Sequence, residues 1–152
     1  MRTVGGLYGL MLGRANLVQA VHLAARGRTA RPAVVAYLEG LDEELEALRD
    51  QLASVQPRCG ECQTFTIYDP KQRLITAPVF RERVLHHAVM NVCGPVLDRR
   101  LIHHSYACRK GKGTVAALHA ARRAAGAAAW FLKLDVRKYF DSIPHERLFA
   151  AL

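Results

Sequence analysis

The sequence predicts an α+β fold. Three observations favour it: segments with helical spacing of apolar residues, a pair of alternating segments separated by a turn, and an apolar segment near the C-terminus. The chain has 152 residues, 51% hydrophobic and 23% charged, which is typical of a globular domain or of part of a larger one. We find no apolar run long enough for a membrane span and no signal-peptide pattern, so we expect a cytoplasmic protein without membrane association.

Two helices are expected in the N-terminal region. The first covers residues 14–25, where Leu17 and Val21 recur at helical spacing. Pro32 fits the start of the second helix, which covers about residues 33–54, because proline is favoured at the first helical position. This second helix carries a stripe of leucine and valine and, apart from it, an acidic cluster that we interpret as a solvated face.

A β-hairpin with a basic tip is expected next, after a turn region that contains Pro57. Residues 65–68 alternate like a strand, residues 69–72 (Asp-Pro-Lys-Gln) are typical of a turn, and residues 73–77 form the returning strand. Just before the hairpin, residues 59–62 form a Cys-Gly-Glu-Cys pattern that could be half of a zinc site or a redox pair. The other two cysteines lack the close spacing of a second ligand pair, so reduced cysteines are the default expectation.

Three helices and one strand are expected in the rest of the chain. Residues 81–92 are predicted to form a helix that ends near Gly94-Pro95, and residues 114–129 an alanine-rich helix. Residues 130–136 (Trp-Phe-Leu-Lys-Leu-Asp-Val) are predicted to form an apolar strand, and Pro144 to open a last helix.

Asp135 stands near the end of this apolar strand. A carboxylate buried there needs a basic partner or a metal ion, and Mg²⁺ is a suitable ion because it binds carboxylate and carbonyl oxygens. The alternative is that Asp135 caps the following turn or pairs with Lys133.

The positive charge is concentrated in the middle of the sequence. The net charge is +9, and residues 59–123 hold 11 basic and 4 acidic residues, which leaves +7 in that segment. Such a segment would be attracted to the phosphate backbone of a nucleic acid. The alternative is a basic surface that serves only solubility.

Four blocks of this sequence resemble reverse transcriptases, in the order in which that family has them. The blocks are DPKQRLITAP (69–78), FRERVLHHA (80–88), SYACRKGKGT (105–114) and LDVRKYFDSIPH (134–145), the last resembling motif A. The residues of these blocks are most similar to those of the enzymes of diversity-generating retroelements, with group II intron enzymes as near neighbours. The resemblance implies an incomplete right-hand polymerase with an N-terminal helical region (1–58), fingers (59–129) and the start of the palm (130–152).

The resemblance also implies site residues for an RNA-directed DNA polymerase that uses two Mg²⁺ ions and deoxynucleoside triphosphates. Asp135 would be catalytic and would bind metal together with the Val136 carbonyl. The nucleotide-binding residues would be Lys71, Arg73, Lys138, Tyr139 and Phe140, with Phe140 as the gate against a ribose hydroxyl. Arg109, Lys110 and Lys112 would hold an RNA template, unless they belong to an ordinary solvated loop. The implied partners are RNA template, DNA primer and a basic accessory protein.

Two departures from the family pattern limit these expectations. Related intron enzymes often place a lysine before the hairpin turn, in a Lys-Pro-Asp-Gly pattern, whereas this hairpin has Tyr68-Asp69-Pro70-Lys71. The family's second aspartate pair would lie well downstream of motif A, and one carboxylate cannot hold two magnesium ions. We therefore expect the 152-residue chain alone not to polymerise DNA. The alternative is a catalytically dead, RNA-binding remnant of a reverse transcriptase.

Overall fold

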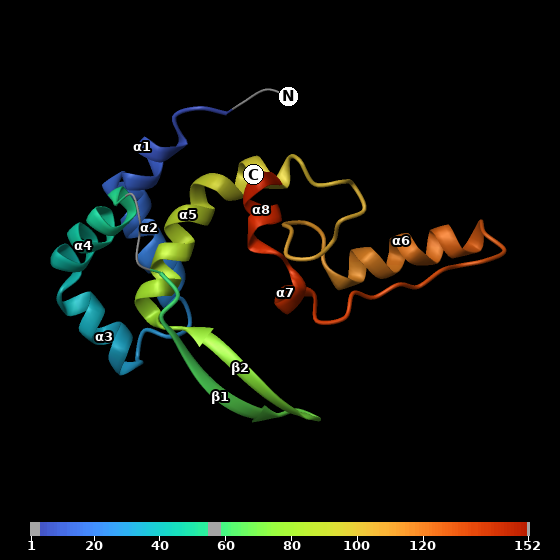
Figure 1. Cartoon of the computed structure of the whole chain (residues 1–152), viewed down its shortest axis with the longest axis horizontal. Helices are drawn as coiled ribbons and strands as arrows, with labels where there is room; N and C mark the ends of the chain where they lie inside the picture. Colours follow the sequence, from blue (N-terminus) through green and yellow to red (C-terminus); the bar gives the residue numbers. More distant parts are fainter. Residues whose placement is uncertain (1–3, 55–58, 152) are drawn as a thin grey trace. The chain divides into compact units, whose positions relative to one another are not determined.

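Helices and one two-stranded sheet make up the computed structural model, which confirms the α+β class (Figure 1). The structure describes residues 4–54 and 59–151, with the backbone alone at Phe140 and Asp141, so the predicted turn at Pro57 lies outside the described residues. It divides into two compact units, Met1–Leu101 and Ile102–Leu152. The division by function into residues 1–58, 59–129 and 130–152 stays a prediction. Within the described ranges no helix has the length and apolar character needed to cross a membrane.

The first unit contains a helical core and the hairpin. Its elements are α1 (Leu7–Leu12), α2 (Arg14–Ala25), α3 (Pro32–Glu39), α4 (Leu41–Ala53), β1 (Cys62–Tyr68), β2 (Gln72–Pro78) and α5 (Phe80–Asp98). The second unit contains α6 (Thr114–Gly126), α7 (Tyr139–Ser142) and α8 (His145–Ala151). The bounds of α2 equal the predicted ones, and α6 ends three residues before the predicted end at residue 129. Pro144 precedes α8 as expected, and its carbonyl accepts the Leu148 N–H at 3.1 Å.

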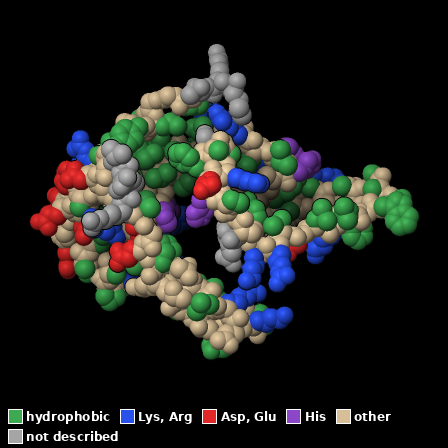
Figure 2. All heavy atoms as spheres, in the orientation of Figure 1, with side chains coloured by type: hydrophobic (Ala, Val, Ile, Leu, Met, Phe, Trp, Pro, Cys, Tyr) green, Lys and Arg blue, Asp and Glu red, His purple; other side chains and the backbone are tan. Residues whose placement is uncertain are grey.

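The core of the first unit forms around the packing of α2 against α5. The buried side chains come from four helices and include Leu17, Ala20, Val21, Ala24, Tyr37, Leu45, Leu48, Val84, Leu85 and Ala88. The Tyr37 ring meets the Phe80 ring edge-on, with 5.1 Å between the ring centroids. Acidic side chains gather over α3 and α4 on the outside of this unit (Figure 2). Because α5 follows β2 after one residue, this core also anchors the hairpin.

The prediction of one continuous helix over residues 33–54 is wrong, because the chain breaks at Gly40. Gly40 has φ −101° and ψ 32°, and it separates α3 from α4. Glycine has a low helix propensity, which favours a break in the helix at this position. Within α3, Val34 and Tyr37 are buried, whereas Val35 and Leu38 of the predicted apolar stripe are exposed.

The prediction that a helix ends near Gly94-Pro95 is also wrong. The helix α5 continues to Asp98 with Pro95 inside it. Proline removes one backbone hydrogen bond and strains the preceding turn, which normally ends a helix. In this chain α5 packs against both α1 and α2, and side-chain hydrogen bonds from Asn16 and Asn91 join α5 to α2. We attribute the continuation through Pro95 to these tertiary contacts.

The predicted strand over residues 130–136 is not formed. The segment after α6 reverses direction and runs back as irregular chain towards α7 (Figure 1). A strand requires a neighbouring strand for its backbone groups, and within the described part of the chain no backbone hydrogen bond joins residues 129–137 to another segment. The buried palm strand that the resemblance implied is therefore absent from this structure, and no described residue of the second unit is buried.

Candidate nucleic-acid interface

The β-hairpin and its basic tip are confirmed. The strands pair antiparallel from Cys62 opposite Pro78 to Tyr68 opposite Gln72, and residues 69–71 form the turn. Within the turn the Asp69 N–H donates to the Lys71 carbonyl at 3.3 Å. The Lys71 side chain is exposed at this tip. Proline and aspartate at the turn explain why the chain reverses there.

Arg73 lies on the strand that leaves the tip. It is directly opposite Ile67, so it shares a face of the hairpin with Phe65 and Ile75, since residues two apart on a strand lie on the same face. Arg73 is exposed, and neither Arg73 nor Lys71 forms an ion pair with any residue that the structure describes. Both cations are therefore open to an anionic ligand.

A buried carboxylate holds the base of the hairpin. Glu82, in the first turn of α5, is 5% exposed, and its Oε2 accepts the Gly60 N–H at 3.1 Å. The same oxygen lies 4.0 Å from Nε2 of His86. This role of Glu82 was not predicted from the sequence, because its partner Gly60 lies 22 residues earlier in the chain. Glu82 therefore positions the chain that leads into β1.

The loop before α6, residues 102–113, is called the basic loop here. Arg109 is half-buried, and its Nη1 donates to the carbonyls of Ile102 at 3.0 Å and Ser105 at 3.2 Å. The Lys112 ammonium donates to the His103 carbonyl and lies 5.0 Å from the centre of the Tyr106 ring. Two of the three cations predicted to bind template thus also hold the loop's own backbone.

Backbone geometry explains the glycines of the basic loop. Gly111 and Gly113 have φ of 71° and 111°, and Cys108 has φ of 57°. Such positive angles favour glycine, which has no side chain to clash. The Lys112 N–H donates to the Arg109 carbonyl at 3.2 Å and closes a tight turn that presents Lys110 to solvent.

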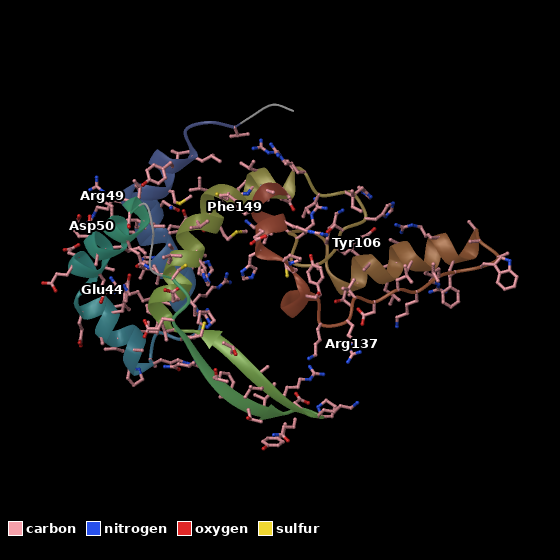
Figure 3. All side chains as sticks on the ribbon, in the orientation of Figure 1. Glu44, Arg49, Asp50, Tyr106, Arg137 and Phe149 are labelled. Atoms are coloured by element: carbon pink, nitrogen blue, oxygen red, sulfur yellow. The ribbon has the colours of Figure 1, made fainter. Side chains whose placement is uncertain are left out.

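An aromatic cluster in the same loop was not anticipated from the sequence. The rings of His103 and His104 lie edge-to-face with centroids 5.0 Å apart. The ring of Tyr106, labelled in Figure 3, lies 6.3 Å from that of His104. The His104 Nδ1 and the Tyr106 hydroxyl are 3.3 Å apart. The sequence signal was the run of His-His-Ser-Tyr, which two residues separate from Arg109 and Lys110. Aromatic rings between cations are typical of surfaces that stack nucleic-acid bases.

Asp135 lies in the irregular segment and is exposed, with Val136 beside it and the exposed cations Lys133, Arg137 and Lys138 nearby in sequence. Lys138 has a left-handed backbone (φ 48°, ψ 49°) directly before α7, and Tyr139 begins that helix. The Phe140 side chain, predicted as the sugar gate, lies outside the described residues.

The side chains that the structure describes around Asp135 do not assemble a magnesium site. Among the described residues there is no group of three or more His, Cys, Asp and Glu side chains that could hold a metal ion. Asp135 supplies a single exposed carboxylate, whereas an ion clamp for phosphoryl transfer needs several oxygen ligands. The donor set therefore does not fit a two-metal centre, and the metal-binding roles of Asp135 and Val136 stay predictions.

Comparison with known proteins gives one partial match for this chain. A stretch of 72 residues, 47% of the chain, is 25% identical to the putative COX1/OXI3 intron 1 protein of Saccharomyces cerevisiae. That stretch corresponds to 9% of the yeast protein, so the chain spans a small part of its relative. No family model matches the chain. The chain is thus partly similar to an intron protein.

Proposed function

We propose that this chain is the fingers region and an adjoining palm segment of a group II intron-like reverse transcriptase, and that it binds RNA through the basic loop. Two observations support the family: four sequence blocks in the family's order and the partial similarity to a yeast intron protein. The diversity-generating retroelement subfamily stays a prediction. One structural observation supports the binding role: Arg109 and Lys112 donate hydrogen bonds to carbonyls of the basic loop itself.

The basic loop has the two components that single-stranded RNA requires. Lys110 offers an exposed charge for a phosphate group, and the rings of His103, His104 and Tyr106 offer faces for bases. Arg109 and Lys112 donate to loop carbonyls, so less conformational freedom is left to lose when RNA binds. On this proposal, Arg109 and Lys112 support the binding surface and Lys110 contacts RNA directly.

Nucleotidyl transfer to a DNA primer is proposed only for the whole protein. Lys71 and Arg73 are exposed cations that suit a triphosphate, and Asp135 would contribute one metal ligand beside others that the described residues do not bring together. Because the donor set is incomplete, we derive no catalytic step. The second candidate is a remnant that binds RNA without chemistry. The two candidates can be separated in a longer protein that synthesises DNA. If Asp135→Asn abolishes DNA synthesis there and leaves RNA affinity unchanged, the second candidate is excluded.

RNA binding can be tested with the 152-residue chain by fluorescence anisotropy on a single-stranded RNA at several salt concentrations. Lys110→Ala should weaken binding and reduce the slope of log affinity against log salt by about 0.7, the value expected for one lost phosphate contact. Arg49→Ala is the matched control, because it removes the same charge from an exposed site on α4, beside Asp50 (Figure 3). Equal slopes for the two variants, or no binding by the wild type, would refute the proposal.

A further inference from the structure

The hairpin of the first unit meets the described helices at its base. Figure 1 shows β1 and β2 projecting from the start of α5, away from the helical core. No residue of either strand is buried, so the hairpin does not rest on that core. The direction in which it projects therefore depends on the few residues that connect its two ends to α5.

Backbone hydrogen bonds join the two ends of the hairpin to each other and to α5. On the β2 side, the Val79 carbonyl accepts the Arg83 N–H at 3.1 Å, which places the end of β2 on the first turn of the helix. On the β1 side, the Glu61 carbonyl accepts the Val79 N–H at 3.1 Å. The Glu82 carboxylate then joins the β1 side directly to α5, because it accepts the Gly60 N–H at 3.1 Å.

Glu82 is the fixed partner in this contact and Gly60 the movable one. Glu82 is 5% exposed, and Val84 and Leu85 of the same helix lie in the core, so the position of the carboxylate is set by packing. Gly60 and Glu61 are exposed, so packing does not hold the chain before β1. Gly60 also has φ of 102°, an angle that glycine adopts far more readily than other residues. The hydrogen bond to Glu82 is therefore what holds this side of the base.

A small rotation at the base becomes a large movement at the tip. Each strand has seven residues, and at about 3.4 Å per residue the tip lies about 24 Å from the base. A rotation of about 10° at the base would displace the tip by about 4 Å. Lys71 lies in the turn and Arg73 two residues further on. The positions of both cations therefore depend on a contact that neither of them makes.

We propose that Glu82 is a positioning residue, which sets the direction of the hairpin through its hydrogen bond to Gly60. The consequence for binding rests on the proposed function, in which the whole protein holds a triphosphate that Lys71 and Arg73 approach from the hairpin. Losing the Glu82 bond would then weaken triphosphate binding although every group that touches the ligand remains, because small displacements of contacting groups are costly.

The distance between two nitroxide labels, measured by electron paramagnetic resonance, reports the direction of the hairpin in the 152-residue chain. The labels are attached to ketone-bearing unnatural side chains in place of Gln72, beside the tip, and Arg49, on α4, so the native cysteines stay unchanged. Both sites are exposed. Glu82→Ala should broaden the distance distribution by about 4 Å or more. Glu82→Gln keeps an oxygen acceptor for the Gly60 N–H and should leave the distribution unchanged.

Glu61→Ala is the matched control, because it removes an exposed carboxylate from the same connecting segment and leaves the Gly60 bond in place. It should not change the distribution. Amide hydrogen exchange followed by NMR gives a second readout. The Gly60 amide should exchange about tenfold faster in Glu82→Ala and at the wild-type rate in Glu82→Gln.

A second variant keeps the test decisive if circular dichroism shows that Glu82→Ala does not fold. Gly60→Ala disturbs the same contact from its exposed side. An added Cβ at Gly60 meets no atom within 4 Å, so the substitution acts through the backbone, where alanine disfavours a φ of 102°. Gly60→Ala should broaden the distance distribution in the same way.

Equal distributions for the wild type and the variant that lacks the contact would overturn the proposal. So would a broad distribution in Glu82→Gln, because the acceptor is then not what matters. His86 Nε2 lies 4.0 Å from the same Glu82 oxygen, so a His86→Ala variant that reproduces Glu82→Ala would also overturn it.

The consequence for binding can be measured in a longer protein that synthesises DNA. Glu82→Ala should raise the KM for the deoxynucleoside triphosphate about tenfold or more, and Glu82→Gln should not. An unchanged KM in Glu82→Ala would refute the role in binding. A longer protein without DNA synthesis would refute the proposed function, and the distance measurements would still decide whether Glu82 sets the direction of the hairpin.

Discussion

Asn16 joins three helices of the first unit through its side-chain amide. Its Nδ2 donates to the carbonyls of Met11 and Ala88, each at 2.9 Å, and its Oδ1 accepts from Asn91 Nδ2 at 3.0 Å. Met11 is in the last turn of α1, where carbonyls have no partner within the helix. Asn16→Ala removes three hydrogen bonds, each with a net value of about 0.5–1.5 kcal/mol. Partial exposure and the higher helix propensity of alanine reduce the expected loss to about 2 kcal/mol.

Urea denaturation followed by helix ellipticity measures this loss. All buried residues that the structure describes belong to the first unit, so the cooperative transition reports on that unit. Gln19→Ala is the matched control, because it removes an exposed amide side chain from the same helix and should change the free energy of unfolding by less than about 0.5 kcal/mol.

A double-mutant cycle tests the mechanism. Asn16→Ala and Asn91→Ala remove the two sides of one hydrogen bond, so their effects should not add, with an interaction energy of at least about 0.5 kcal/mol. Additive effects would refute the network. The reasoning would also fail if Asn16→Ala cost no more than Gln19→Ala.

Further predictions concern Tyr37, Leu48 and Arg109. The Tyr37 hydroxyl is buried without a hydrogen-bond partner among the described residues, so Tyr37→Phe should raise the free energy of unfolding at neutral pH by about 1 kcal/mol. Burial, helped by the Glu44 carboxylate, raises the pKa of Tyr37 from 10.0 to about 12. The native state therefore holds this proton more tightly than the unfolded chain, and denaturation at rising pH should show stability being lost between pH 10.0 and about 12, less so in Tyr37→Phe. Leu48→Ala, at a fully buried site, should cost about 3 kcal/mol in the same denaturation experiment. Arg109→Ala should speed amide hydrogen exchange in the basic loop, because it removes two hydrogen bonds to the loop's carbonyls. Lys110→Ala should not, because the Lys110 side chain is exposed and makes no such bond within the described residues.

Local sequence signals were sufficient where neighbours in the chain decide the structure. The helical spacing around Leu17 and Val21 predicted α2, and the turn-forming residues 69–72 predicted the hairpin with Lys71 at its tip. The glycines of the basic loop also follow local backbone geometry, because Gly111 and Gly113 have positive φ angles that glycine adopts readily. The roles proposed for Lys71, Lys110 and Asp135 in binding or catalysis stay predictions, because they depend on ligands.

Residues distant in sequence decided the rest. Pro95 predicted a helix end, yet α5 continues past it because packing against α1 and α2 outweighs one lost backbone hydrogen bond. The apolar residues 130–136 predicted a buried strand, but a strand depends on a partner for its hydrogen bonds, and the described chain provides none. The sequence by itself determined the helix α2 and the hairpin turn. Only the tertiary structure decided the course of α5, the loop contacts of Arg109 and the exposure of Asp135, because those depend on which distant groups meet.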